Sequence, residues 1–233
     1  METATYIRRR GQLETYFDRT AVEAWSRLTS DAPVSKVRAT VRAGRDRMRA
    51  TLLSWLPADL SAKRLLDAGC GTGMLAVEAA KRGARVTAID ISPTLVGLAG
   101  ERLPHELGTG SIDFRVGDML SPDLGRFDHV VSMDSLIHYK AADIVAALAG
   151  LARRTDGSIV FTFAPRTPAL TLMHAVGKLF PRGDRAPAIE PVGEATLRRL
   201  FAADPVLCRW RVGRTERIVS GFYTSQAMEL VSA

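Results

Sequence analysis

One repeating pattern governs the middle of this 233-residue chain: short apolar runs alternate with helical segments from Lys63 to Phe163. The predicted strands are 64–67, 85–89, 112–116, 129–133 and 158–163. The predicted helices between them are 74–82, 93–103 and 141–153. This alternation predicts an open, mostly parallel, doubly wound α/β sheet, in which ligand sites lie at the ends of the strands.

The segments before this region are helical in pattern. Apolar residues recur at helical spacing over 12–28 and again over 35–55, with Pro57 just after the second segment. Within the alternating region, Ser92 and Pro93 mark a helix start, because proline at the first helical position gives up an amide that has no partner there.

Two apolar runs near the end, 206–212 and 218–225, are separated by Gly213–Thr215 and predict an antiparallel hairpin. Five parallel strands closed by such a hairpin make seven strands, the architecture of Rossmann-like methyltransferases. We therefore expect an N-terminal helical cap or lid over 1–60 and a methyltransferase core over 61–233. A lid segment is expected within that core at about 165–190.

Composition limits the cellular compartment in which we expect this chain. Hydrophobic residues make up 46%, and no apolar run reaches the roughly 18–20 residues that span a bilayer. The start METATYIRRRGQ has no apolar segment behind it, so no secretory signal is expected. Two cysteines, Cys70 and Cys208, are too few for a disulfide framework or a cysteine zinc site. A cytoplasmic setting without protein-bound metal follows, and the net charge of +7 suits an acidic partner.

The stretch LLDAGCGTGML places glycines at 69, 71 and 73, directly after the first predicted strand. This G-x-G-x-G differs from the G-x-G-x-x-G of dinucleotide folds and from a P-loop. A ligand without phosphates needs glycines only for a tight turn and for close approach of the backbone. The motif alone is weak, because ordinary turns between a strand and a helix often contain glycine.

Three aspartates follow three predicted strands and sharpen this interpretation. Asp67 lies where the ammonium of an amino acid would be, and Asp90 can accept hydrogen bonds from both hydroxyls of a ribose. Asp118 can accept one from an adenine amine, with Met119 and Leu120 beside the base. Each acid alone also fits a helix cap or a solvated strand end. Together they predict a site for adenosine joined to an amino acid, S-adenosylmethionine.

The blocks LLDAGCGTG, VTAIDIS, VGDM and FDHVVSMDSLIHY resemble the class I S-adenosylmethionine-dependent methyltransferases over about residues 65–163. These motifs are specific for the cofactor and not for the substrate. The cofactor-binding residues expected on this basis are Asp67, Gly69, Cys70, Gly71, Gly73, Asp90, Ile91, Asp118, Met119 and Met133.

The flanks carry a narrower resemblance. TYFDRTAVEAWSRLTSDAPVSKVRATVRAGRDRM, DSLIHY and TERIVSGFYTSQ resemble the magnesium-protoporphyrin IX O-methyltransferases of bacteriochlorophyll and chlorophyll synthesis. That family methylates one porphyrin propionate to its methyl ester. The resemblance implies catalytic roles for His138 and Tyr16. It also implies substrate contacts from Phe17, Trp25, Tyr139 and Arg166.

The N-terminal segment departs from the pattern of plant and cyanobacterial members. Ala21, Val22, Ala24 and Thr29 occupy some of its positions, while Trp25 matches. The resemblance further implies hand-over of the substrate from magnesium chelatase and peripheral association with the cytoplasmic or photosynthetic membrane face. The apolar segment TPALTLMHAVGKLFPRGDRAP could cover the ring system or touch that membrane, or it could be a crossover helix packed on the sheet. Arg166, Arg182 and Arg185 are candidates for binding the other propionate.

In the expected reaction a carboxylate oxygen attacks the sulfonium methyl, the bond between this methyl and sulfur breaks, and S-adenosylhomocysteine leaves. A propionate is already ionised near pH 7, since model carboxyl groups have pKa values of about 4.3. Catalysis should therefore rest on positioning. His138 could orient the carboxylate, remove a proton or ligate the porphyrin magnesium, and these roles stay open.

Three other functions share parts of this pattern. A methyltransferase acting on another small molecule would use the same cofactor, and so would a regulator that binds the cofactor without catalysis. The high isoelectric point alone would suit a nucleic-acid methyltransferase. However, the chain has no Asn/Asp-Pro-Pro-Tyr stretch, no Pro-Cys and no basic–aromatic cluster, so no nucleic-acid partner is expected.

Overall fold

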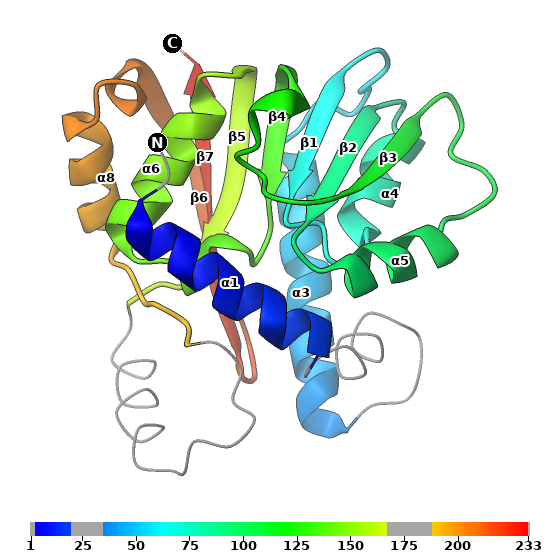
Figure 1. Cartoon of the computed structure of the whole chain (residues 1–233), viewed down its shortest axis with the longest axis horizontal. Helices are drawn as coiled ribbons and strands as arrows, with labels where there is room; N and C mark the ends of the chain where they lie inside the picture. The colour runs from blue at the N-terminus through cyan, green and yellow to red at the C-terminus, as the bar shows by residue number, and fades with distance from the viewer. Residues whose placement is uncertain (1–2, 20–34, 167–187, 233) are drawn as a thin grey trace.

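The structure of the protein is a computed structural model that describes residues 3–19, 35–166 and 188–232. In these residues seven strands form one sheet in the order β3-β2-β1-β4-β5-β7-β6 (Figure 1). The strands are β1 (Arg64–Ala68), β2 (Arg85–Asp90), β3 (Ser111–Val116), β4 (Phe127–Ser132), β5 (Thr155–Phe163), β6 (Trp210–Ser220) and β7 (Tyr223–Ser232). The first five are parallel, and β7 pairs antiparallel with both β5 and β6. The predicted fold class is confirmed.

Helices cover both faces of this sheet (Figure 1). The α-helices of the described residues are α1 (Ala4–Arg19), α3 (Lys36–Ser54), α4 (Met74–Lys81), α5 (Pro93–Glu101), α6 (Ala141–Ala152) and α8 (Glu194–Ala203). Short 3₁₀ turns are η1 (Pro122–Leu124), η2 (Leu136–His138) and η3 (Leu207–Arg209). The predicted start of α5 is confirmed, because the Ser92 side chain accepts a hydrogen bond from the Leu95 amide at 3.2 Å and Pro93 follows it.

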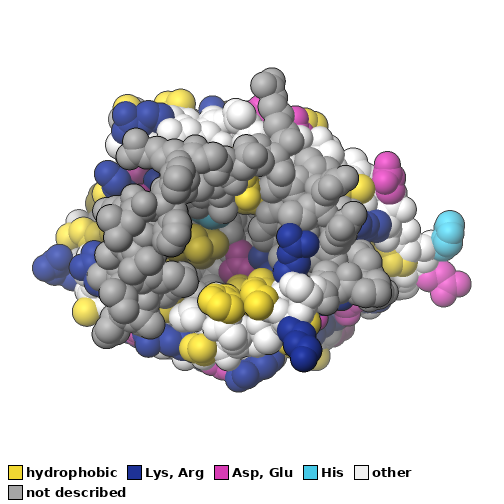
Figure 2. Space-filling model, turned by 90° about the horizontal axis from the view of Figure 1, so that it is seen from below, with side chains coloured by type: hydrophobic (Ala, Val, Ile, Leu, Met, Phe, Trp, Pro, Cys, Tyr) yellow, Lys and Arg dark blue, Asp and Glu magenta, His cyan; other side chains and the backbone are white. Residues whose placement is uncertain are grey.

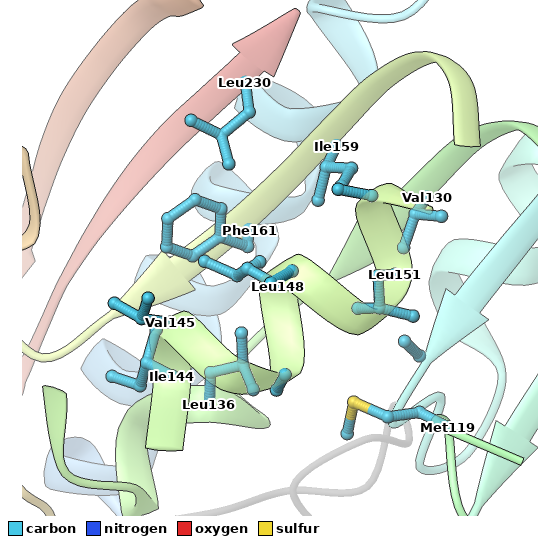
Figure 3. Close-up of a cluster of buried hydrophobic side chains, with 14 of the residues drawn as sticks. Met119, Val130, Leu136, Ile144, Val145, Leu148, Leu151, Ile159, Phe161 and Leu230 are labelled. Carbon is cyan, nitrogen blue, oxygen red and sulfur yellow. The ribbon is translucent and has the colours of Figure 1, made fainter. Parts of the chain in front are cut away.

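The central strands are apolar on both faces because both faces are covered. On one face α6 packs against β4 and β5, and Figure 3 shows Leu148 and Leu151 close to Val130, Ile159 and Phe161. The alternate residues of the same strands point the other way. Val131 and Val160 join a second cluster with α3 and α4. The middle of the sheet is thus closed to polar ligands.

Helix α3 is part of that second layer. Its buried residues Met48, Leu52 and Leu53 share a core with the strands. Gly44 lets the helix approach β7 closely, since a Cβ there would lie 2.6 Å from the ring of Tyr223. The predicted helix over 35–55 is confirmed, and it shares its core with the segment beyond the domain boundary predicted at residue 60.

Helix α1 begins at Ala4, eight residues before the predicted start at Gln12. The Thr3 hydroxyl accepts a hydrogen bond from the Tyr6 amide at 3.0 Å and caps the first turn. Tyr6 and Leu13, seven residues apart, are both buried on one helix face. The predicted start was wrong because this cap was not recognised, and the predicted residues 20–28 lie outside the described residues.

The C-terminal hairpin exists, but its predicted turn was wrong. The chain turns at Gly221–Phe222, and Gly213–Thr215 lies within β6 at an irregularity of the ladder. There the Arg214 amide donates to Oε2 of Glu229 at 3.1 Å, and the Arg214 guanidinium also contacts this carboxylate. Glycine at 213 marked a bulge, where the exposed Arg214 pairs with the buried Glu229, and did not mark a turn.

Substitution of Gly44 by alanine tests the contact between α3 and β7. Alanine usually stabilises a helix by about 1 kcal/mol relative to glycine, but overpacking against Tyr223 costs about 1–3 kcal/mol. We expect Gly44→Ala to lower the free energy of unfolding, measured by urea denaturation. Gly97→Ala in α5 is the matched control, since no atom lies within 4 Å of its added Cβ. It should raise the free energy of unfolding, and an equal gain at both positions would contradict the close approach.

Candidate active site

A cavity of about 1120 Å³, including its open mouth, lies at the carboxyl ends of β1, β2 and β4. Figure 2 looks toward this edge and shows a hollow with hydrophobic and basic side chains near it and an acidic side chain inside. Helices α1 and α3 contribute two of its walls. The cavity is therefore where the strand order β2-β1-β4 places the predicted ligand site.

The glycine loop forms the wall next to β1. The amides of Gly69 and Cys70 both donate to the Ile89 carbonyl, at 2.9 and 3.0 Å, which binds the loop to β2. Gly69 has a φ of +87°, and a Cβ there would lie 2.5 Å from the Ser135 side chain. Gly71 has a φ of +54° and donates to Oδ2 of Asp90 at 2.8 Å. Glycine is needed here for backbone conformation and for close approach, as the sequence predicted.

Asp67 carries a strongly perturbed carboxyl group in the cavity wall. Its side chain is buried, and Oδ2 has no hydrogen-bond partner among the described residues. Burial, and then the nearby charge of Asp90, raise the pKa of Asp67 to about 7. An unpaired buried carboxyl oxygen facing a cavity is a site for a cationic or hydrogen-bond-donating group.

Asp90 lies on the neighbouring strand end and is already partly hydrogen-bonded. Its Oδ1 accepts from the Ser92 amide at 3.0 Å, and its Oδ2 accepts from Gly71. Burial nevertheless raises its pKa, and burial also raises the pKa of the Cys70 thiol between the two acids. Remaining lone pairs on Asp90 can accept from hydroxyl groups of a ligand.

Helix α1 lies across this edge of the sheet and bonds to elements that follow different strands (Figure 1). Thr5 donates to Oδ1 of Asp143 at the start of α6, at 2.7 Å. At the other end, Oδ1 of Asp18 accepts from the amide and the hydroxyl of Thr94, at 3.2 and 2.5 Å, at the start of α5. The helix is thus fixed at both ends over the cavity.

The middle of α1 engages Asp118. Oδ1 of Asp118 accepts from the Tyr6 hydroxyl at 3.0 Å and from the Leu120 amide at 2.7 Å, and Oδ2 pairs with Arg10. Gly117 lines the cavity and Asp118 does not. The sequence predicted Asp118 as the acceptor for an adenine amine, which stays a prediction; in the structure its carboxylate contacts Tyr6 and Arg10 of α1.

His138 reaches the cavity from η2, directly after β4. It is 7% exposed, and its ring lies 6.0 Å from the ring of Phe17 on α1 at an angle of 64°. Tyr16 packs edge-on against Phe17 with centroids 5.2 Å apart, and burial raises the pKa of its hydroxyl. His138 and Phe17 line the cavity, whereas Tyr16 does not. The structure therefore brings the two predicted catalytic residues to the same region, with Phe17 between them.

The other predicted site residues divide into three groups. Those lining the cavity, with the residues above, are Asp67, Gly69, Cys70, Gly71, Asp90, Ile91, Met119, Met133 and Tyr139. Gly73 caps the start of α4 outside the lining. Arg166 is exposed, and among the described residues its backbone amide donates to the Val192 carbonyl at 3.1 Å. The structure does not bring Arg166 into the cavity. Trp25, Arg182 and Arg185 lie outside the described residues.

Sequence reasoning missed several cavity residues. Arg42, Arg45 and Arg49 line it from α3, and Asp134 lines it from the end of β4. The spacing of three and four residues in VRAGRDRMRA does place these arginines on one helix face. That signal was available, but an arginine-rich helix face usually lies in solvent. Asp134 stood within the quoted motif MDSLIHY without an assigned role.

The fold, the glycine loop and the buried acids define an S-adenosylmethionine-dependent methyltransferase, and a model of the methyltransferase domain matches residues 65–156. A second family model, the C-terminus of magnesium-protoporphyrin IX methyltransferase, matches residues 132–232.

Similar proteins extend this likeness over the whole chain. The magnesium-protoporphyrin O-methyltransferase of Rhodobacter capsulatus is 51% identical over 96% of this chain and 97% of its own length. The enzyme of Synechocystis sp. is 31% identical over 93% of both chains. A crystal structure of magnesium protoporphyrin IX methyltransferase from Synechocystis PCC 6803 with bound S-adenosylhomocysteine superposes with a TM-score of 0.83. It is 30% identical and covers 96% of this chain and 99% of that one. This chain belongs to the magnesium-protoporphyrin O-methyltransferase family.

Because the pKa of Asp67 is raised, we expect cofactor binding to depend on pH if this carboxyl group contacts the cofactor. With a pKa of about 7, the carboxyl group is mostly protonated at pH 6. A bound ammonium group favours the carboxylate, lowers this pKa and releases the proton. We expect S-adenosylhomocysteine binding to release up to about one proton at pH 6 and none at pH 9. Calorimetry in buffers of different ionisation enthalpy measures this release. Equal release by Asp67→Asn would contradict the assignment.

Proposed function

We propose that this chain methylates one propionate of magnesium-protoporphyrin IX and forms the monomethyl ester of (bacterio)chlorophyll synthesis. The observation that carries the proposal is the identity of 51% with the Rhodobacter capsulatus enzyme over 96% of the chain, flanks included. The flanks matter because the cap helices and the C-terminal hairpin belong to them. A similarity confined to the cofactor motifs would not indicate which substrate accepts the methyl group.

The cavity fits the cofactor by its own chemistry. When bound, S-adenosylmethionine supplies the methyl group. We propose that the unpaired Oδ2 of Asp67 faces the positive end of the cofactor and that Asp90 accepts from the ribose hydroxyls. The glycine loop leaves room for backbone approach, and Ile91, Met119 and Met133 offer apolar contacts. Among the described residues no cluster of three His, Cys, Asp or Glu side chains could hold a metal ion.

At the acceptor end the protein's task is positioning. A propionate is ionised near neutral pH and needs no strong base. We propose that His138 donates a hydrogen bond to this carboxylate. The ring of Phe17, 6.0 Å from the imidazole ring, limits rotation of the His138 side chain. Apolar groups such as Leu13 and Met119 exclude water from the same space. Tyr16 is proposed to act behind Phe17 and to hold that ring in place.

The first test is formation of the monomethyl ester, followed by chromatography of the pigment. We expect His138→Ala to lower kcat/KM about 10–100-fold, the cost of a lost hydrogen bond to a charged group. Affinity for S-adenosylhomocysteine should stay unchanged. His105→Ala, at an exposed position, is the matched control and should keep full activity.

His138→Gln separates two of the roles left open for this residue, orientation of the carboxylate and removal of a proton. Glutamine can donate a hydrogen bond but cannot accept a proton at neutral pH. If His138→Gln is more active than His138→Ala, the result supports a role in orienting the carboxylate. If it is no more active at any pH, the result supports removal of a proton. If wild type binds S-adenosylmethionine and forms no ester from magnesium-protoporphyrin IX, the proposed substrate is wrong.

We further propose that the cavity mouth rests on the cytoplasmic face of a membrane and receives its insoluble substrate there, including by hand-over from magnesium chelatase. Support comes from exposed apolar side chains at this end: Phe222 (67% exposed), Val219 (58%) and Val37 (50%). The Ser220 hydroxyl donates to the Thr40 carbonyl at 2.8 Å, so the hairpin tip and the start of α3 adjoin. In the described residues no helix is long and apolar enough to cross a bilayer.

Vesicle co-sedimentation tests the membrane contact. We expect Phe222→Ser to reduce binding to phosphatidylglycerol vesicles several-fold, because an aromatic anchor is removed, while Phe222→Trp retains it. Phosphatidylcholine vesicles, which have no net charge, and high salt, which screens charge, show how much of the vesicle binding is electrostatic. Equal binding of all three proteins, or no binding at all, would contradict the proposal.

A further inference from the structure

The polar face of α3 points into the cavity. Arg42, Arg45 and Arg49 are spaced by three and four residues, are partly buried, and all line the cavity. Arg47, on the same helix, is exposed and lies outside the lining. The same wall has two carboxylates, Asp46 and Asp134, so its three guanidinium groups leave it with a net positive charge that suits an anionic ligand.

One of these arginines is held in place by a buried carboxylate. Nη1 of Arg45 donates to Oδ2 of Asp134 at 2.8 Å, and the Asp134 side chain is 4% exposed. Asp134 also accepts from the hydroxyls of Tyr223 and Ser225, at 3.1 and 3.2 Å, and from Thr162 at 3.3 Å. The aspartate has a φ of +54°, a conformation that non-glycine residues rarely adopt. This cluster fixes the direction of the Arg45 guanidinium, as a built binding group requires.

The strand-end acids and the arginines that line the cavity come from different elements. The acids Asp67 and Asp90 lie at the ends of β1 and β2, where the glycine loop begins. The arginines lie on α3, where Arg49 pairs with Asp46 at 2.8 Å and also reaches the sulfur of Met74 at 3.7 Å. A ligand with a cationic centre and a carboxylate, or two such ligands side by side, would match this arrangement.

We infer that Arg42, Arg45 and Arg49 form a carboxylate-binding wall, the arginine wall. A guanidinium has five N–H donors in a planar fork, which can bind a carboxylate with two parallel hydrogen bonds. Two sources of that carboxylate exist: the methionine end of the cofactor, and the porphyrin propionate that is not methylated. The second source rests on the proposed function.

The experiment compares ligands that differ only in the carboxylate. Calorimetry measures S-adenosylhomocysteine against 5′-methylthioadenosine, which lacks the amino-acid end. Fluorescence quenching measures magnesium-protoporphyrin IX against its dimethyl ester, in which both propionates are neutral. The variants are Arg42→Gln and the pair Arg45→Gln/Asp134→Asn, in which the buried acid is neutralised together with its partner. Arg47→Gln is the control with the same change of charge, and thermal unfolding verifies that each variant folds.

We expect Arg42→Gln or the paired variant to weaken binding of a carboxylate-bearing ligand about 10–100-fold, with its neutral counterpart unaffected. If only S-adenosylhomocysteine loses affinity, the arginines bind the carboxylate of the cofactor. If only the free porphyrin acid loses affinity, they bind the propionate. The inference is overturned if both variants bind all four ligands like Arg47→Gln, or if charged and neutral ligands weaken equally. Absence of porphyrin binding by wild type would contradict the proposed function and leave the cofactor comparison as the test of the arginine wall.

Discussion

Burial of both faces of the central strands is the constraint on which this structure depends. Val130 and Val131 are neighbours in β4, yet they belong to hydrophobic clusters on opposite sides of the sheet. Polar groups therefore have no place along the strands and gather where the strands end. The cavity is a direct result, because β1, β2 and β4 end next to one another and deliver Asp67, Asp90 and Asp134 to one edge. Helices α1 and α3 then close that edge from two sides, and each contributes the side chains that its own packing leaves pointing inward.

The cavity combines groups that oppose one another electrostatically. Asp67 and Asp90 raise the free energy of the empty site, since both are buried and the charge of one disfavours ionisation of the other. A bound cation relieves this repulsion, and the relief contributes to the free energy of binding. The proposed arginine wall would have the reverse role on α3, because guanidinium groups suit the anionic part of a ligand.

The sequence allowed the sheet, the glycine loop and the residues at strand ends to be predicted, because these follow from local periodicity and from parallel pairing. It did not allow side-chain direction to be predicted where a distant element decides it. Asp118 follows β3 as expected, but Tyr6 and Arg10, more than a hundred residues away in the chain, engage its oxygens. Gly213 suggested a turn, and only the contact between Arg214 and Glu229 makes it a bulge. The arginine spacing of α3 is also typical of a solvated helix face, and only the packing of the helix on the sheet places these residues at the cavity.

The Asp134 cluster has a consequence for the order in which this protein matures. Two of its donors, Tyr223 and Ser225, belong to β7, which is translated after every other strand of the sheet. β7 also lies between β5 and β6, so it must insert beside a strand made some sixty residues earlier. During synthesis the glycine loop and its acids can form well before the ribosome has delivered these two hydroxyls. The orientation of Arg45 is therefore acquired late, and a nascent chain can have most of its fold while this side chain still lacks a fixed direction.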